Sequence, residues 1–517
     1  MNIAHGLERA ARHFPDRPAI LFEGREIGYR ELEERVNRIA RGLATLGVEM
    51  GDRVALFLPN IPAFPIAYLA VQKLGAMAVS VNVMLTTGEL DYVLADSGAK
   101  VIFTAEALWP ALEPLVGERL SRDRVVICEG EVAGVRTLPA FGASHPPEFK
   151  AREMERDAPA AILYTSGTTG RQKGAVLSHG NVVSNLFTVN RYLGMAPSDR
   201  VLITTPLFHV AAQNVMMNSG FNAAATLVLH RRFDVQRCAG AIEEHRVTLV
   251  MGVPTIYIAL LDARVSPQAL SSVRLFKSAA ATMPVEIARR WQETYGKTVY
   301  EGYGLTETSP AATFNHEYEY RPGSVGTPVD MVEMRVVDAE DREVPPGTWG
   351  EVVFRGPNVM LGYWNRPHET AEAMRTGWFH TGDIGYLDED GYLYLVDRVK
   401  DMINSAGFKI WPREVEEALY QHPAVCECAV AGVPDPIKGE IAKAYIVLRA
   451  GGKATEQELD AYCRGRLAAY KVPRAFAFVD HLPKNAAGKV LKRVLREQEA
   501  APAARVGTKA TFGQGHG

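Results

Sequence analysis

Cysteine is scarce in this sequence, with five residues among 517. Their number is odd, and no pair has a zinc-ligand spacing that a second pair completes, which argues against a disulfide framework and a structural zinc site. Cys426 and Cys428 lie in an apolar run where a strand points both side chains to one face, so we expect them to be buried. The five are typical of reduced thiols in a cytoplasmic protein: Cys128, Cys238, Cys426, Cys428 and Cys463.

A large excess of either charge is also missing. Lys and Arg number 57 against 60 Asp and Glu, a net charge of −3, so no electrostatic argument favours a nucleic-acid partner. No uninterrupted apolar run approaches the roughly 18 residues that a membrane-spanning helix needs. Residues 1–20 carry charges throughout and lack an apolar core, so we expect no signal peptide. We therefore expect a cytoplasmic protein without a membrane span, and a homodimer is compatible with the sequence.

Short apolar runs alternate with helical patterns from residue 28 to about 310. The runs are rich in Val, Ile and Leu throughout, as in strands that are buried on both faces. This alternation predicts mostly parallel sheets flanked by helices, with ligands at the carboxyl ends of the strands. The expected strands are Arg53–Leu58, Met77–Val81, Lys100–Thr104, Ala160–Tyr164, Arg200–Thr204, Thr226–Leu229, Thr248–Met251, Val273–Lys277 and Thr298–Glu301.

The pattern changes after about residue 330, where alternating strands with Gly and Pro turns dominate. A compact α+β pattern follows, with one helix that begins at Pro412 and another with a capping box from Thr455 to Glu458. The last residues are small and polar, which is typical of disorder. The sequence thus predicts an α/β protein with three parts: a large N-terminal domain of mostly parallel sheets flanked by helices plus a β-rich subdomain (1–397), a small mobile α+β C-terminal domain (398–500) and a disordered tail (501–517).

The expected strand Ala160–Tyr164 runs directly into the segment Thr165–Gly174, TSGTTGRQKG. Its glycines let the backbone approach a ligand, its hydroxyl groups donate hydrogen bonds and its two cations add positive charge, so the segment predicts a polyphosphate-binding loop. It is not a Walker A loop, because no glycine precedes Lys173 and no Ser or Thr follows it. The continuation Gly174–Ser178 is expected to be another strand rather than a helix.

The segment Tyr164–Gly174 resembles the signature of the adenylate-forming superfamily of acyl-CoA synthetases, luciferases and nonribosomal adenylation domains. Segments similar to its other core motifs follow in the expected order, so the resemblance covers nearly the whole chain. It implies that a carboxylate attacks the α-phosphate of ATP, that pyrophosphate leaves, and that an acceptor takes the acyl group from the acyl-AMP anhydride. The implied cofactors are ATP, Mg²⁺ and coenzyme A, with a small-molecule carboxylic acid as substrate.

The resemblance also implies which residues bind the nucleotide. Glu307 would hold Mg²⁺ with Thr165 nearby, and Asp383 would accept the ribose hydroxyls. Ser278–Thr282 is similar to the adenine-lining turn, but Ala279 stands where relatives carry glycine, which puts close backbone approach there in doubt. The implied nucleotide-binding residues are Thr165, Ser166, Gly167, Thr168, Thr169, Gly170, Lys173, Ala280, Ala281, Thr282, Glu301, Gly302, Tyr303, Gly304, Thr306, Asp383 and Arg398.

Two lysines would connect the half-reactions. The resemblance makes Lys489, in the turn Leu482–Lys489, the cation between the substrate carboxylate and the α-phosphate, a role that suits a point charge on a flexible stem. It makes Lys400 the hinge about which the C-terminal domain rotates between adenylation and thioester formation. The implied catalytic residues are Lys489, Glu307, Thr165 and His209, and the implied coenzyme A contacts are Gly407, Phe408 and Lys409.

The acyl pocket is expected around Pro206–His209, which precedes an expected apolar helix, Val210–Gly220. His209 would form a wall or gate. Small residues nearby indicate space rather than charge, and no basic residue is evident for a second carboxylate, which disfavours dicarboxylic acids. The implied pocket residues are His209, Val210, Ala211, Gly304 and Ala311, with Ala212 and Ala312 beside them.

The main functional hypothesis is an acid–coenzyme A ligase for a medium- or long-chain fatty acid. An aromatic or hydroxycinnamate-type acid is the first alternative. The second alternative keeps adenylation but transfers the acyl group to an amine or a carrier, and we expect no assembly-line module because no attached carrier domain is evident. A non-catalytic homologue is disfavoured because Lys489, Glu307, Asp383 and Arg398 are all present.

Overall fold

The computed structural model describes residues 1–165 and 172–500. The described residues form two compact units, the first from Met1–Lys400 together with Lys484–Lys489, the second from Asp401–Pro483 together with residues 490–500; the predicted tail, 501–517, lies outside the described residues. The boundary therefore lies between Lys400 and Asp401, whereas the sequence prediction put it between residues 397 and 398. The short segment Lys484–Lys489 belongs to the first unit, although the chain on both sides of it belongs to the second.

One sheet of the first unit is mostly parallel. Its six strands from β8 to the edge strand β7 are parallel, and β9 and β19 are added antiparallel at the opposite edge. The order is β19 (Gly362–Tyr363), β9 (Lys173–Ser178), β8 (Pro159–Thr165), β4 (Met77–Ser80), β3 (Arg53–Leu56), β5 (Val101–Thr104), β6 (Val125–Ile127) and β7 (Arg136–Thr137).

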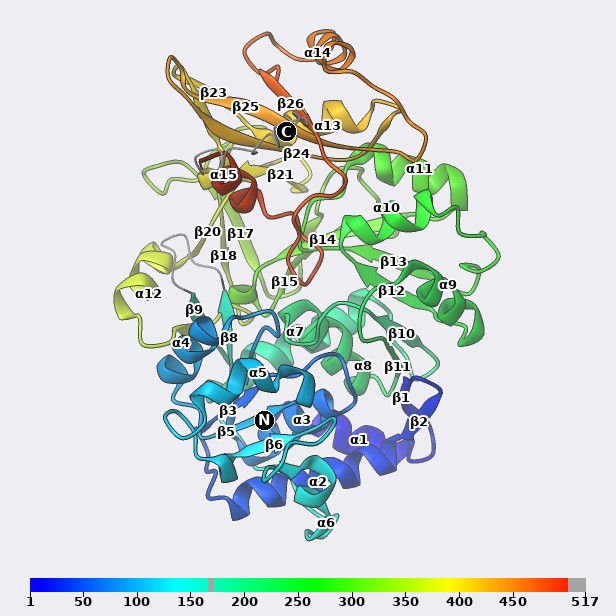
Figure 1. The fold of residues 1–517 in the computed structure, drawn as a ribbon, viewed down its shortest axis with the longest axis vertical. Coiled ribbons are helices and arrows are strands. Elements are labelled where there is room, and N and C mark those ends of the chain that lie inside the picture. Colours follow the sequence, from blue (N-terminus) through cyan, green and yellow to red (C-terminus); the bar gives the residue numbers. More distant parts are fainter. Residues whose placement is uncertain (166–171, 501–517) are drawn as a thin grey trace, which may run out of the picture. The chain divides into compact units, whose positions relative to one another are not determined.

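A second sheet of the first unit is parallel from β1 to β14, where β15 turns back antiparallel. Helix α7 (His179–Tyr192) contacts strands of both sheets, β9 and β15, and so lies between them (Figure 1). The order is β16 (Thr327–Pro328), β15 (Ala311–Phe314), β14 (Val299–Gly304), β13 (Leu275–Ser278), β12 (Leu249–Gly252), β10 (Arg200–Ile203), β11 (Thr226–Leu229), β1 (Pro18–Phe22) and β2 (Arg25–Gly28).

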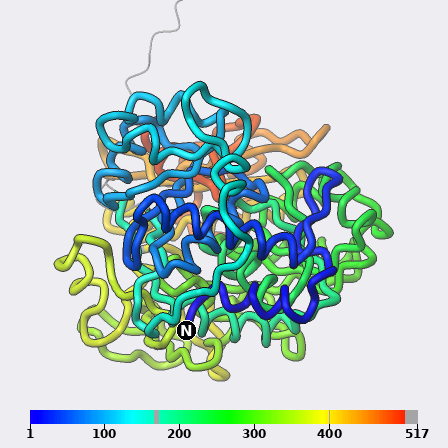
Figure 2. The backbone as a smooth tube through the Cα atoms, turned by 90° about the horizontal axis from the view of Figure 1, so that it is seen from below, coloured from blue at the N-terminus to red at the C-terminus, as the bar shows by residue number. Residues whose placement is uncertain are grey.

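Helices cover these sheets with their apolar faces. In α2 (Tyr29–Thr45) the apolar residues Leu32, Val36 and Leu43 follow helical spacing and are fully buried. Figure 2 shows the dark-blue N-terminal chain, which includes α1 and α2, crossing the first unit in the view from below. The other helices of this unit are α1 (His5–His13), α3 (Ala63–Leu74), α4 (Thr87–Ser97), α5 (Trp109–Leu112), α6 (Leu138–Ala143), α8 (Ser219–Asn222), α9 (Val235–Glu244), α10 (Pro254–Asp262), α11 (Val285–Tyr295) and α12 (Pro367–Ala373).

The β-rich part of the first unit is an antiparallel sheet in the order β17 (Glu333–Val337), β18 (Gly350–Arg355), β20 (Phe379–Leu387) and β21 (Leu393–Arg398). The second unit is α+β. Its strands are β22 (Ile403–Ser405), β23 (Phe408–Ile410), β24 (Val425–Asp435), β25 (Gly439–Leu448) and β26 (Ala475–Phe478), and its helices are α13 (Pro412–Tyr420), α14 (Glu456–Arg464) and α15 (Lys492–Ala500). The predicted fold class, the start of α13 and the capping box of Thr455 and Glu458 are confirmed.

The segment expected to be an apolar helix, Val210–Gly220, differs from the prediction. Residues Ala211–Asn218 form a π-helix that continues into α8, and its buried side chains include the polar Gln213, Asn214 and Asn218. These amides have polar neighbours inside the core: Asn218 donates to Asn214 at 3.0 Å, and Ser80 donates to Gln213 at 2.6 Å. A buried run gives no periodic signal that separates a π-helix from an α-helix, so the sequence could not distinguish them.

Candidate active site

The predicted phosphate loop closes a hairpin between β8 and β9. Thr165 and Lys173 face each other at its base, where the Thr165 hydroxyl donates to the Lys173 carbonyl at 3.4 Å. The predicted residues Ser166, Gly167, Thr168, Thr169 and Gly170 lie outside the described part of the chain. The continuation of the loop is a strand, as expected, so the hairpin differs from the strand–loop–helix of a Walker A site.

Residues that the sequence analysis missed hold the base of this hairpin. The Tyr164 hydroxyl donates to Asp96 at 2.7 Å, and the Tyr92 hydroxyl donates to the carbonyl of Gln172 at 2.9 Å. Trp364 donates its indole N–H to the Asp96 carbonyl, also at 2.9 Å. These contacts join segments that are distant in sequence, and no local pattern marks Asp96 or Tyr92 as their partners.

Glu307 lies in a short 3₁₀ helix, Thr306–Thr308, directly after β14, and only 8% of its surface is exposed. Its Oε1 accepts a hydrogen bond from the Tyr363 hydroxyl at 2.9 Å. Burial raises the pKa of Glu307 above its usual range, although this hydrogen bond opposes the rise. The Lys173 ammonium lies 5.3 Å from the centre of the Tyr363 ring, so Tyr363 links two predicted site residues that are far apart in sequence.

Asp383 is held between two other predicted residues. The Tyr303 hydroxyl donates to its Oδ2 at 2.6 Å, and Arg398 Nε lies 3.0 Å from its Oδ1. Asp383 and Arg398 are also cross-strand partners in β20 and β21. Burial, and then the charge of Asp383, raise the pKa of Tyr303, so Tyr303 keeps its proton as a donor. A carboxylate has about four lone-pair positions, which leaves Asp383 able to accept further hydrogen bonds from hydroxyl groups of a ligand.

The predicted adenine-lining turn follows β13, beside β14. Ser278 is the cross-strand neighbour of Glu301, and Oε2 of Glu301 accepts the N–H of Met283 at 3.1 Å. The unusual backbone is at Ala280, whose φ of 67° lies in the left-handed region, rather than at Ala279, where the sequence raised a doubt. A non-glycine residue in this region costs about 1–2 kcal/mol, so the surrounding contacts must stabilise the turn.

The small residues of the predicted acyl pocket have a packing reason. Gly304 pairs with Ala311 across β14 and β15, and a Cβ on Gly304 would lie 1.7 Å from the Pro310 carbonyl oxygen. Close approach of two backbones therefore accounts for glycine at this position, and the place of Gly304 in the acyl pocket stays a prediction. The π-helix that begins at Ala211, directly after His209 and Val210, contacts the same region, because Asn214 donates to the Ser309 carbonyl at 3.2 Å.

His209 and Lys489 lie close enough to interact. Burial, and then the positive charge of Lys489, lower the pKa of His209 to about 4, so the imidazole is neutral at pH 7. Its Nδ1 accepts the N–H of Ala211 at 3.3 Å, which fixes the position of the ring. Lys489 is presented by a turn in which its N–H donates to Asn485 Oδ1 at 2.9 Å. The carbonyl of Gly488 in this turn accepts a hydrogen bond from Thr255 at 3.3 Å.

The predicted coenzyme A contacts belong to the second unit. Gly407 has a φ of 86°, and its N–H donates to Asn404 at 3.2 Å, which makes a tight turn between β22 and β23. Phe408 is 56% exposed and stacks on Tyr470 with ring centres 5.0 Å apart. Lys409 is exposed beside it. Tyr470, which the sequence did not indicate, adds a second aromatic ring to Phe408.

No group of three or more His, Cys, Asp and Glu suited to hold a metal ion occurs in residues 1–165 and 172–500. None of the helices in these ranges combines the length and the apolar character that crossing a bilayer requires.

Comparison with known proteins identifies the same family that the motifs resemble, along nearly the whole chain. The family model described as AMP-binding enzyme matches residues 7–364, and that of the AMP-binding enzyme C-terminal domain matches residues 414–489. A long-chain-fatty-acid–CoA ligase of Bacillus subtilis is 37% identical over 95% of this chain and 94% of the relative. A feruloyl-CoA synthase of an Amycolatopsis species is 40% identical over 95% of this chain and 97% of the relative.

A solved structure supports the match of fold. The anthranilate CoA ligase AuaEII in complex with anthranoyl-AMP aligns with a TM-score of 0.90 and 30% identity, and the alignment covers 96% of this chain and 97% of that one.

Proposed function

Because this chain belongs to the AMP-binding enzyme family, in its acyl-CoA ligase branch, we propose that it joins an apolar carboxylic acid to coenzyme A through an acyl-AMP intermediate. In the first step a carboxylate oxygen attacks the α-phosphorus of ATP and the bond to pyrophosphate breaks. In the second step the coenzyme A thiolate attacks the acyl carbon and AMP leaves, while the thiol proton passes to solvent. Both steps bring anions together, so they need fixed positive charge and hydrogen-bond donors.

Lys489 supplies that charge in our proposal. Its ammonium stands between the carboxylate and the α-phosphate and reduces their repulsion in the first step. The observation that carries the proposal is the place of the Lys489 turn: it belongs to the unit that contains His209, and the Gly488 carbonyl beside Lys489 accepts a hydrogen bond from Thr255 at 3.3 Å. In our proposal the neutral His209 forms the wall of the acyl pocket, and the buried Val210 that follows offers apolar surface to the acyl chain.

The nucleotide is held by the loops at the carboxyl ends of β8, β13 and β14 and by the β20–β21 pair. Lys173, Thr165 and the hairpin loop contact the phosphates, the 278–282 turn lines the adenine with Glu301 and Gly302 behind it, and Asp383 and Arg398 take the ribose. Support comes from the hydrogen bonds of Asp383 to Tyr303 and of Glu307 to Tyr363, which bring these segments together.

Glu307 fits a magnesium site in which the phosphates of the bound nucleotide supply the other ligands. Mg²⁺ is commonly held by one or two carboxylates plus substrate phosphates, so a single buried carboxylate near Lys173 suits it without a larger cluster of ligands. When bound, the ion would neutralise phosphate charge. Thr165, at the start of the phosphate loop, is the second residue that we propose near it. Tyr363 orients Glu307 by donating to its Oε1.

The acid is proposed to be a medium- or long-chain fatty acid, with an aromatic or hydroxycinnamate-type acid as the second candidate. The relatives at 37% and 40% identity favour one candidate each, so they do not separate the two. Initial rates of AMP release with saturated acids of increasing length, ferulate and benzoate decide between them. The proposal predicts the highest kcat/KM for a fatty acid, and a higher value for ferulate would replace it with the second candidate.

Transfer to coenzyme A is proposed to use the second unit. Gly407, Phe408 and Lys409 would guide the pantetheine arm, and Lys400 at the boundary would serve as the hinge between the two half-reactions. The cytoplasmic location and the homodimer expected from the sequence stay predictions.

A further inference from the structure

The ladder between β18 and β20 is interrupted next to Asp383. Glu351 pairs with Ile384, and the next pair joins Val353 to His380. Three residues of β20, 381–383, therefore lie opposite a single residue of β18, Val352, and they bulge out of the sheet. A bulge of this kind turns a side chain in a direction that a regular strand would not allow, and its backbone groups need partners outside the ladder.

Side chains supply these partners. The Gly382 N–H donates to Glu351 Oε1 at 2.9 Å, and Gly382 has a φ of 71°, which favours glycine. The Thr381 hydroxyl donates to the Val352 carbonyl at 2.7 Å and accepts the Asp383 N–H at 3.1 Å. The conformation at Asp383 thus depends on two side chains, and one of them, Glu351, comes from the neighbouring strand.

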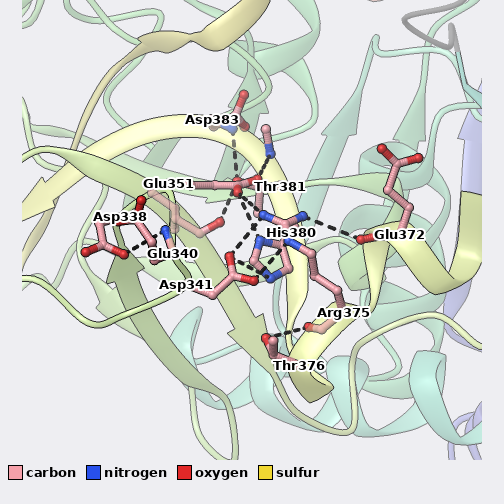
Figure 3. Close-up of polar contacts among 12 residues, drawn as sticks. Asp338, Glu340, Asp341, Glu351, Glu372, Arg375, Thr376, His380, Thr381 and Asp383 are labelled. Atoms are coloured by element: carbon pink, nitrogen blue, oxygen red, sulfur yellow. Dashed lines mark hydrogen bonds and ion pairs between the residues drawn. The ribbon is translucent and has the colours of Figure 1, made fainter.

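Glu351 is itself fixed by cationic and aromatic neighbours (Figure 3). Its Oε2 accepts a hydrogen bond from Arg375 at 2.9 Å and lies 2.9 Å from His380 Nδ1. Arg375 also donates to both carboxylate oxygens of Asp341, at 3.1 and 3.2 Å. The His380 side chain is 3% exposed, so the ring cannot leave easily. Arg375 and His380 thus hold one oxygen of the Glu351 carboxylate, while the other accepts the N–H of Gly382.

We infer that Glu351 is a positioning residue for the ribose of the bound nucleotide, acting through the Gly382 N–H on the direction of Asp383. The inference rests on the proposed nucleotide site. Tyr303 and Arg398 hold the carboxylate of Asp383 from one side, and the bulge holds its backbone from the other. Without Glu351 the bulge loses one of its backbone partners, and Asp383 no longer meets the ribose hydroxyls in a fixed geometry.

The test compares AMP with 2′-deoxy-AMP and 3′-deoxy-AMP by calorimetry on the full chain. The wild-type protein should bind AMP more tightly than either deoxynucleotide. Glu351→Ala should reduce this preference by about 10-fold, the effect expected when a hydrogen bond to a charged group is lost. Glu351→Gln can still accept from Gly382 but not from Arg375, so its preference should lie between those of wild type and Glu351→Ala. If Glu351→Ala fails to fold, the binding preference of Glu351→Gln alone tests the role of Glu351.

Glu333→Ala is the matched control, because Glu333 lies in the neighbouring strand β17 and pairs with an arginine, Arg355, at 2.6 Å. It should leave the preference for AMP unchanged. The inference is wrong if a folded Glu351 variant prefers AMP over the deoxynucleotides as strongly as wild type does. It is also wrong if the variant loses affinity for AMP and for the deoxynucleotides by the same factor. A wild-type protein that binds AMP no better than the deoxynucleotides would overturn the proposed role of Asp383 itself, which is a separate result.

Discussion

At the scale of single residues, Lys489 is the group on which acid activation depends in our proposal. Lys489→Ala removes the charge between two anions, so acid-dependent ATP–pyrophosphate exchange should fall by about 100-fold or more. Thioester formation from added acyl-AMP should change much less, because that step does not join two anions at the α-phosphate. Lys453→Ala, at an exposed lysine of the second unit, is the control and should leave both rates unchanged. If Lys489→Ala exchanges pyrophosphate at the wild-type rate, Lys489 has no role in the adenylation step.

Gly304 tests the close approach of β14 and β15. In Gly304→Ala the new methyl group meets the Pro310 carbonyl, so the backbone must move, and we expect a loss of about 3 kcal/mol or more in the free energy of unfolding. Gly240→Ala is the same substitution at an exposed position of helix α9, with no atom within 4 Å of the added Cβ, and should stabilise by up to about 1 kcal/mol. Urea unfolding measures both, and equal effects would contradict the packing argument.

The residues of the site were predictable where a local segment carries them. Glu307, Asp383 and Arg398 each lie in a short motif, and the structure brings them into one region of the first unit. Tyr363 and Glu351 could not be found in this way. Their roles arise from pairing between strands that are distant in the chain, and a Tyr or a Glu in a strand carries no local signal of its partner.

At the scale of elements, a buried lysine joins three helices. The Lys73 side chain in α3 has no exposed surface and donates to Glu8 of α1 at 2.9 Å, to Glu33 of α2 and to the Phe149 carbonyl at 3.0 Å. Lys73→Met leaves two half-buried carboxylates without their cation, and we expect a loss of about 3–5 kcal/mol in the free energy of unfolding. In Lys100→Met, which removes an ion pair of a lysine that is 47% exposed, the loss should stay within about 1 kcal/mol.

Helix α7 predicts the response of stability to acid. His179 at its start is fully buried, and burial, followed by the charge of the N-terminus, lowers its pKa to about 3. The unfolded chain, with a usual pKa near 6.5, therefore binds protons more readily than the folded one below that pH. The contribution of His179 to the free energy of unfolding should be constant above about pH 6.5 and should fall by about 3 kcal/mol by pH 4. Denaturant titrations should show a smaller fall in His179→Gln, and an identical fall would contradict this account.

The elements themselves were largely predictable from the sequence. The strands β3, β4, β5, β10, β11, β12 and β13 lie at or within a few residues of the expected runs, because strands buried on both faces are continuously apolar. The same property hid the π-helix at Ala211–Asn218 and the ion cluster of Lys73. In both cases buried polar groups lie within apolar segments, and their partners come from other elements.

At the scale of the whole molecule, the chain is an AMP-binding family enzyme with two compact units, and the proposed reaction has two half-reactions. The segment Lys484–Lys489 belongs to the first unit, where His209 lies, whereas Gly407 belongs to the second. If Lys400 is the hinge, Lys400→Pro should slow release of acyl-CoA in steady state and leave ATP–pyrophosphate exchange close to the wild-type rate. Equal effects on both rates would contradict a hinge role.

The central claim is that the acid is activated as an acyl adenylate before coenzyme A reacts. The most direct measurement follows heavy oxygen from a labelled carboxylate of the preferred acid into the products by mass spectrometry. Attack of the carboxylate on the α-phosphorus predicts one labelled oxygen in each AMP released, none in pyrophosphate, and one acyl-CoA formed for each AMP. Label in pyrophosphate or inorganic phosphate, or AMP without label, would contradict the account.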